Sequence, residues 1–184
     1  MKVCVFCGSS FGGDPSFSKA AESLGKALAK RGDSLVYGGS RRGLMGVVSD
    51  SCFQNGGEVI AVQPRFFLEA GAVTDSVTTL IPTDTMSERK QKMIDISDCF
   101  IALPGGIGTL DEVSEIMTDL GLGQIKGKII LFNVNHFYDS LVELLHSYLS
   151  HGFLKDNWLG WPIVCSSIEE VEKALDEIKG ATHA

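Results

Sequence analysis

The sequence has neither a long apolar run nor a stretch of positive charge. No segment reaches the roughly 18 to 20 consecutive apolar residues that a membrane-spanning helix needs. The run Val3–Cys7 is too short for the core of a signal peptide. The formal net charge is -7, and the basic stripe that a nucleic-acid surface requires is missing. We therefore expect a cytoplasmic protein with no membrane and no nucleic-acid partner.

Cysteine is present but does not form a disulfide framework. The five cysteines, at positions 4, 7, 52, 99 and 165, are odd in number, and four of them lie in strand-like or core-like runs. Cys4 and Cys7 make a C-x-x-C pair, which raises a redox or zinc role. Within a strand their odd separation puts the two side chains on opposite faces, and no second cysteine or histidine pair lies nearby. We expect reduced thiols packed in the core.

Histidine is scarce as well. The four histidines, at positions 136, 146, 151 and 183, all lie in the last third of the chain, away from its glycine-rich turns. A Ser-His-Asp or Cys-His mechanism therefore has no visible base. The spacing of these histidines fits no metal site. We expect no metal and no cofactor.

The 184 residues show no linker, charge run or low-complexity tract, so we expect a single domain over residues 1–184. Short apolar runs alternate with segments of helical spacing. Because the runs are continuously apolar, they favour an α/β fold of three layers, with a mostly parallel sheet flanked by helices. The predicted strands are Met1–Phe6, Leu35–Tyr37, Val59–Val62, Thr78–Ile81, Cys99–Leu103, Ile129–Phe132 and Ile163–Cys165, and the predicted helices are Pro15–Arg31, Val47–Phe53, Ser87–Ile96, one after Pro104, Phe137–Leu149 and Ile168–Ile178.

The segment from Pro104 to Glu112, PGGIGTLDE, is the most informative part of the chain. It follows a predicted strand and opens a predicted helix. At such a helix N-terminus, free backbone N–H groups and the positive end of the helix dipole bind anions, and glycines let a phosphate approach closely. Glu112 and Glu115, three residues apart, share one helix face just beyond that position. The pattern predicts a phosphate cradle with carboxylates near the attached sugar.

Two more glycine-rich turns follow predicted strands, at residues 8–10 and 38–43. Ligands of α/β sheets bind at the carboxyl ends of the strands, so Ser9, Gly39 and Ser40 are further candidates for substrate contact. Neither the G-x-G-x-x-G dinucleotide pattern nor the P-loop, with its lysine, is present. These absences disfavour a dinucleotide dehydrogenase and an ATPase.

Three motifs together carry a family resemblance. Residues 104–112 fit PGGxGTxxE, residues 86–90 (MSERK) resemble MHERK, and residues 37–46 (YGGSRRGLMG) resemble YGGGxxGLMG. In this order they are similar to the LOG family, the cytokinin riboside 5'-monophosphate phosphoribohydrolases, which are often mislabelled as lysine decarboxylases. The resemblance extends from the first strand to about Cys165.

The resemblance implies a Rossmann-like homodimer that hydrolyses the N-glycosidic bond of a nucleoside 5'-monophosphate, such as AMP or a cytokinin nucleotide. Arg89 and Glu112 match the family's catalytic pair. Ser40 and Ser87 replace a glycine and a histidine of the motifs, and Gly71, with Glu69 two places earlier, stands where many members carry an acid. The positions that match substrate contacts are Lys90, Gly105, Gly106, Ile107, Gly108, Thr109, Leu110 and Asp111.

The expected chemistry agrees with these residues. Cleavage of a ribosyl C1'–N bond passes through an oxocarbenium-like state, which a carboxylate near C1' stabilises while it activates water. We assign that role to Glu112. Phosphate binding at residues 105–109 supplies binding energy away from the reacting bond and orients it.

Three other functions remain open at this point. A lysine decarboxylase would need pyridoxal phosphate on a lysine, in a fold normally larger than this chain. A metal-assisted phosphatase could place Asp111, Glu112 and Glu115 around Mg²⁺. A non-catalytic carrier is the third, because molybdenum-cofactor carriers resemble this fold.

Overall fold

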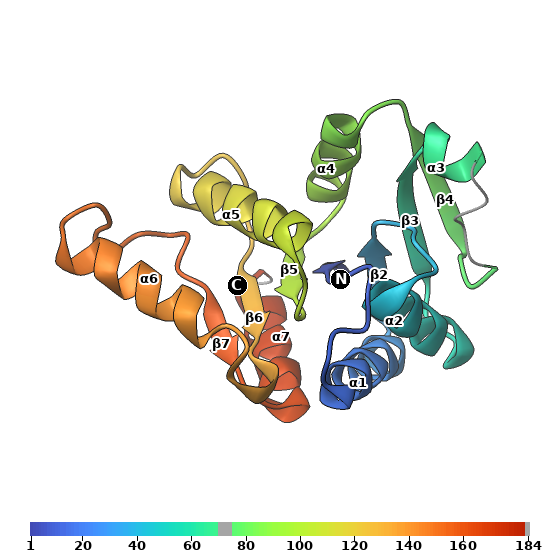
Figure 1. Ribbon diagram of the computed structural model, residues 1–184, viewed down its shortest axis with the longest axis horizontal. Coiled ribbons are helices and arrows are strands. Elements are labelled where there is room, and N and C mark those ends of the chain that lie inside the picture. Colours follow the sequence, from blue (N-terminus) through green and yellow to red (C-terminus); the bar gives the residue numbers. More distant parts are fainter. Residues whose placement is uncertain (70–74, 183–184) are drawn as a thin grey trace.

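Seven parallel strands form the central sheet of the computed structural model, which describes residues 1–69 and 75–182 (Figure 1). Their order is β4-β3-β2-β1-β5-β6-β7. The chain therefore builds outward from β1 to β4 and then returns to the other side of β1 with β5. Ligands of such sheets bind where the order reverses, here between β1 and β5. The strands are β1 Lys2–Phe6, β2 Ser34–Tyr37, β3 Val59–Pro64, β4 Thr79–Thr83, β5 Cys99–Ala102, β6 Ile129–Phe132 and β7 Ile163–Cys165.

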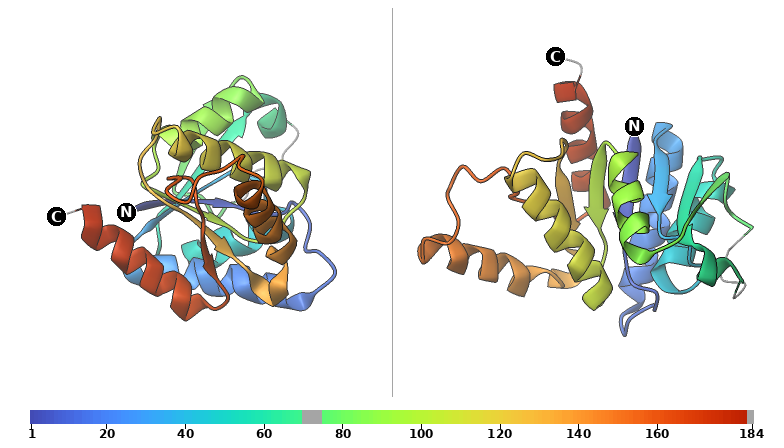
Figure 2. Two further views of the ribbon diagram at one scale, coloured as in Figure 1. Left: turned by 90° about the vertical axis from the view of Figure 1, so that its left-hand side faces the viewer. Right: turned by 90° about the horizontal axis from the view of Figure 1, so that it is seen from above.

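Helices cover both faces of the sheet, and Figure 2 shows α5 and α7 on opposite sides of it. One apolar core lies between the sheet and α1, α2 and α7, and the other between the sheet and α4, α5 and α6. Alternate residues of β1 enter the two cores. The helices are α1 Pro15–Arg31, α2 Gly43–Gln54, α3 Arg65–Glu69, α4 Met86–Asp95, α5 Ile107–Gly121, α6 Asp139–Ser150 and α7 Ile168–Thr182, with a 3₁₀ turn η1 at Val134–His136.

The predicted α/β class is confirmed, and each predicted strand is present. The prediction for the second helix was wrong at its start, since α2 begins at Gly43 and not at Val47. Its first turn contains Gly43 and Gly46, and glycines so close together favour a loop. Gly46 is needed there for packing, because a Cβ at that position would collide with the carbonyl group of Arg41. The short elements α3 and η1 were not predicted.

The cysteines take the places that the strand pattern predicted. Cys4 lies in the core under α4 to α6, and Cys7 lies in the core under α1, α2 and α7. All five thiols are free and buried. Burial raises the pKa of the Cys52 thiol to about 11 and that of Cys99 to about 12, so these groups stay protonated and unreactive at neutral pH.

Helix capping fixes where α4 begins. Thr85 is the N-cap, and its side chain accepts a hydrogen bond of 3.1 Å from the backbone N–H of Glu88. The Glu88 carboxylate accepts one of 2.9 Å from the N–H of Asp84. These bonds resemble a capping box and hold the first turn in place. Arg89 and Lys90 therefore start the second turn at a defined orientation, facing α5.

In the part of the chain that the structure describes, no helix combines the length and the apolar character that a membrane crossing requires.

Candidate functional site

The three glycine-rich turns meet at the carboxyl edge of the sheet, as predicted from their positions after strands. The N–H of Gly8, after β1, donates a 3.1 Å hydrogen bond to the carbonyl of Pro104, after β5. A Cβ at Gly105 would lie 2.9 Å from the Gly8 nitrogen. Gly43, with φ of +59°, packs so closely on the backbone of Ser9 and Ser10 that a side chain would overlap it. The glycines thus bring three backbones into contact where the sheet order reverses.

The first turn of α5 presents free backbone N–H groups. Its N-cap is Gly106, which has an extended backbone and no side chain to accept from those groups. Residues 106–108 are exposed, and an added Cβ at Gly106 or Gly108 would meet no described atom within 4 Å. Thr109 is buried against Gly105. This helix start therefore has the open donors that bind an anion.

Arg89 of α4 and Glu112 of α5 form a buried ion pair. Arg89 Nη1 lies 3.1 Å from Glu112 Oε1, and each side chain is 10% exposed. Arg89 reaches this position by passing over Gly38, where any Cβ would collide with its guanidinium. Burial raises the pKa of the Glu112 carboxyl above its usual range, although Arg89 opposes that shift. A carboxylate with a raised pKa is suited to accept a proton near neutral pH.

Lys90 forms a second set of ion pairs beside the first. Its Nζ lies 2.9 Å from Asp111 Oδ2 and 3.0 Å from Glu115 Oε2. The hydrogen bond to Asp111 contributes most to a raised pKa of Lys90. Glu115 therefore pairs with Lys90 and Glu112 with Arg89, so the two carboxylates that the spacing placed on one face have different partners.

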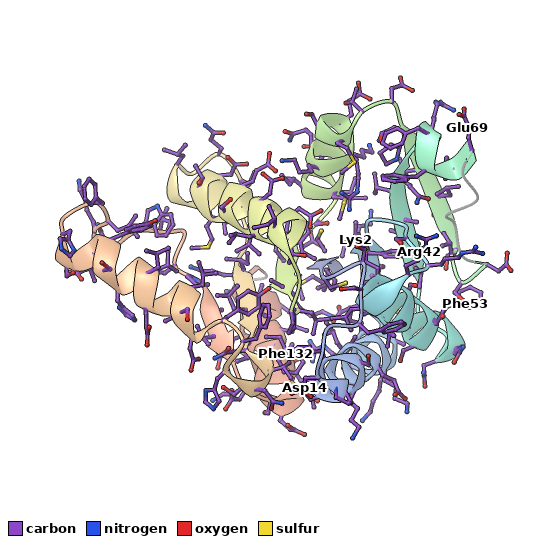
Figure 3. All side chains as sticks on the ribbon, viewed as in Figure 1. Lys2, Asp14, Arg42, Phe53, Glu69 and Phe132 are labelled. Carbon is purple, nitrogen blue, oxygen red and sulfur yellow. The ribbon has the colours of Figure 1, made fainter. Side chains whose placement is uncertain are left out.

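A cavity of about 520 Å³ opens beside this network, between α2, α3 and α4. Its volume is within the range of small-ligand sites. Arg89 forms part of the wall, whereas Glu112 does not, and it contacts Arg89 from the α5 side. Arg42, the N-cap of α2, is labelled in Figure 3. The lining residues are Ser9, Gly38, Ser40, Arg41, Arg42, Met45, Gln63, Phe67, Met86 and Arg89.

The predicted phosphate cradle borders a neighbouring cavity of about 440 Å³. Gly105, Gly106, Ile107, Thr109 and Leu110 form one of its walls, and α6 with the segment before it forms the other. The cradle thus lines the cavity of about 440 Å³, and Arg89 lines the cavity of about 520 Å³. Ser9 and Ser40 lie on the Arg89 side, and Gly39 packs against Gln63.

Sequence reasoning did not single out Gln63 or Phe67 in this wall. Gln63 is the one polar residue of β3, VIAVQP, and it lies just beyond the predicted strand Val59–Val62. A polar residue at the carboxyl end of such a strand was the available signal. Glu69 ends α3 and is exposed (Figure 3), and Gly71, the other position named in that motif comparison, lies outside the described residues.

Comparisons with known proteins agree with these motifs. Residues 45–175 match the family model described as "Possible lysine decarboxylase". The cytokinin riboside 5'-monophosphate phosphoribohydrolase LOG of Oryza sativa subsp. japonica is 40% identical over 96% of this chain and 73% of its own length. The cytokinin riboside 5'-monophosphate phosphoribohydrolase LOG1 of Arabidopsis thaliana is 37% identical over 96% of this chain and 83% of its own length.

Among solved structures, a molybdenum cofactor binding protein from Rippkaea orientalis is similar, with a TM-score of 0.74 and 26% identity. The match covers 97% of this chain and 96% of that one. The molybdenum cofactor carrier protein of Chlamydomonas reinhardtii has a TM-score of 0.73, 19% identity and coverage of 97% and 98%, and shows the shared fold.

The ion pair predicts a pH-dependent loss of stability. Arg89→Met leaves Glu112 buried without its partner, so we expect the free energy of unfolding at pH 7 to fall by about 3–5 kcal/mol. Loss of the guanidinium raises the pKa of Glu112 further above that of the unfolded chain. The folded state then binds more protons than the unfolded chain. The loss in the free energy of unfolding therefore becomes larger as the pH rises and smaller toward pH 4. Urea unfolding between pH 4 and 8 measures this loss.

The double variant Arg89→Met/Glu112→Gln serves as the control, because it removes both charges and should recover most of the stability at pH 7. A deficit of equal size at pH 4 and pH 7, or no recovery in the double variant, would contradict the assignment.

Proposed function

The chain belongs to the LOG family of phosphoribohydrolases, and we propose that it hydrolyses the N-glycosidic bond of a nucleoside 5'-monophosphate, AMP or a cytokinin riboside 5'-monophosphate, to free base and ribose 5-phosphate. The observation that carries the proposal is the buried Arg89–Glu112 pair. It lies between a cavity of nucleotide size and a helix start with free amides.

In the proposed mechanism, the amides of residues 105–109 bind the 5'-phosphate, and Arg89 directs the ribose toward Glu112. For this, the guanidinium shifts its hydrogen bond from the carboxylate to the substrate. Glu112 then takes a proton from water as the water oxygen bonds to C1' and the C1'–N bond breaks. The electron pair of that bond leaves with the base, which takes up a proton. The raised pKa of Glu112 favours this transfer.

Lys90, the lysine of this site, does not have the properties that a lysine decarboxylase needs. A Schiff-base lysine needs a lowered pKa, which burial or a nearby cation provides. Lys90 instead lies between two carboxylates, and its pKa is raised. The phosphatase hypothesis meets a similar objection, because Asp111, Glu112 and Glu115 already have cationic partners. The carrier hypothesis rests on the shared fold, and it does not explain the buried Arg89–Glu112 pair.

We also propose that the protein is a cytoplasmic homodimer. Five buried free thiols fit a reducing compartment. An apolar groove runs between α5 and α6, and large side chains are exposed along it, among them Leu110 and Leu144, each 44% exposed, and Tyr148, 42% exposed. Ile107, beside the groove in the first turn of α5, is 82% exposed. Exposed apolar surface of this kind marks an interface, and a second copy is the simplest occupant.

The first prediction concerns the reaction itself. Incubation with AMP should release adenine and ribose 5-phosphate, and Glu112→Gln should reduce kcat by about 10²- to 10⁴-fold because it removes the proton acceptor. The acid limb of kcat/KM should lie above the ordinary glutamate pKa of about 4.3 and be absent from the residual activity of the variant. Chromatography of the products and pH profiles test this.

Two outcomes would favour the alternatives. Inorganic phosphate in place of adenine, with loss of activity in chelator, indicates a phosphatase. Binding of AMP with no product at all indicates a carrier. Near-normal turnover of Glu112→Gln contradicts the assigned mechanism.

A second prediction separates phosphate binding from folding. Gly106 has φ of -97° and open space around its missing Cβ, so Gly106→Val should fold normally while its side chain blocks the anion. We expect AMP affinity to fall at least about tenfold, as expected for loss of one charge-assisted hydrogen bond or more. Gly180→Val in α7, also with open space, is the matched control. Calorimetry with AMP and thermal unfolding are the measurements, and equal affinities in the two variants would contradict the cradle.

A third prediction concerns assembly. Leu144→Glu puts a charge in the α5–α6 groove and should convert a dimer of the 19.8 kDa chain to a monomer. Phe53→Glu changes a side chain of similar exposure on α2, away from α6 (Figure 3), and should leave the dimer intact. Light scattering after size-exclusion chromatography measures the mass of each variant. A monomeric wild-type protein, or a Leu144→Glu variant that remains dimeric, would contradict this interface.

A further inference from the structure

Gln63 is a buried polar side chain whose acceptor has no partner. It is 1% exposed, in the penultimate position of β3, and its Oε1 accepts no hydrogen bond from any described residue. Such a group destabilises a fold unless something else satisfies it. Gln63 also lines the 520 Å³ cavity that Arg89 borders. The residue therefore places an unpaired acceptor in the wall of that cavity.

Gly39, in the turn after the neighbouring strand, packs closely on this amide. A Cβ at Gly39 would lie 3.0 Å from Cβ and 3.1 Å from Oε1 of Gln63. Gly39 also has φ of +82°, a conformation that favours glycine. The backbone there is thus shaped so that no side chain from the β2 turn covers the Gln63 carboxamide.

The order of the strands places Gln63 at the base end of a bound nucleotide. The phosphate cradle follows β5, and β1 and β2 lie between β5 and β3. Three strand spacings of about 4.8 Å separate the two positions by roughly 14 Å. That is about the length of a nucleoside 5'-monophosphate from its phosphorus to the far edge of a purine. Arg89, over Gly38 at the end of β2, lies between them, near the sugar.

Two apolar side chains complete this end of the cavity. Phe67 of α3 and Met86 of α4 line it, and each is 42% exposed. An aromatic ring and a thioether are suited to contact the face of a purine, whereas they offer nothing to a phosphate. The wall therefore combines apolar contact from these two side chains with the acceptor of Gln63, as small-molecule sites commonly do.

Building on the proposed function, we propose that Gln63, Phe67 and Met86 form the base subsite, and that Gln63 Oε1 accepts a hydrogen bond from an exocyclic amino group of the base. Gln63 is then a specificity residue. It favours a 6-aminopurine that keeps at least one N–H over a purine with hydrogen or oxygen at that position, because those bases leave the buried acceptor unsatisfied or face it with a second acceptor.

The test measures binding in Glu112→Gln protein, so that no base is released during the titration. Calorimetry compares AMP, purine riboside 5'-monophosphate and inosine 5'-monophosphate. We expect AMP to bind about tenfold or more tightly than the other two. Gln63→Met keeps the length of the side chain and removes the acceptor, so the three affinities should become nearly equal. Gln91→Met, the same change on the exposed face of α4, should keep the preference.

Thermal unfolding separates specificity from structure. Gln63→Met should leave the unliganded protein as stable as before or more stable, because a thioether needs no buried partner. A clear loss of stability together with an unchanged AMP preference would show a structural role and overturn the proposal. A preference of the Glu112→Gln protein for inosine 5'-monophosphate would overturn it as well.

The two proposals fail separately. If no nucleotide releases its base but Gln63→Met still removes the preference for AMP, the hydrolase proposal fails and the base subsite stands. If adenine is released but Gln63→Met leaves the preference unchanged, the subsite fails and the hydrolase proposal stands.

Discussion

The candidate site depends on one interaction, the ion pair of Arg89 with Glu112, 3.1 Å long and almost fully buried. Removing two charges from water is costly, and their attraction offsets that cost only when both are held in good geometry. Here the capped start of α4 orients Arg89, and the absence of a side chain at Gly38 gives the guanidinium its path. Much of the local sequence is therefore explained by what this pair requires.

Unfavourable features gather around the same pair. Arg89 Nε and Gln63 Oε1 are buried without partners among residues 1–69 and 75–182, Gly39 and Gly43 hold positive φ, and α5 begins with no side-chain cap. Asp14 and Thr85 cap α1 and α4 with side-chain hydrogen bonds, whereas α2 and α6, like α5, begin without one. Locally unfavourable features are commonly found together where a ligand binds and satisfies them. Because several lie at one edge of the sheet, they argue for a functional site more strongly than any one motif does.

The sequence predicted the architecture because each strand is a short continuous apolar run, and such runs alternate with helices. It predicted that the glycine turns share one edge, since that follows from parallel strands. It did not predict that Arg89 and Lys90, neighbours in α4, divide the acids of α5 between them, because that depends on the orientation of the two helices. Nor did it predict the close packing of Gln63 on Gly39, because that contact depends on how β3 lies against the turn after β2.

The charged neighbours Asp111 and Lys90 affect the pKa of Glu112. Asp111 raises the pKa of its neighbour, and Lys90 lowers it. By holding Asp111 and Glu115, Lys90 prevents three carboxylates from facing one another without cations. Without Lys90, the pKa of Glu112 would rise further, and a protonated carboxyl cannot take a proton from water. Lys90 therefore favours the ionised form of Glu112, while Arg89 forms the ion pair with it.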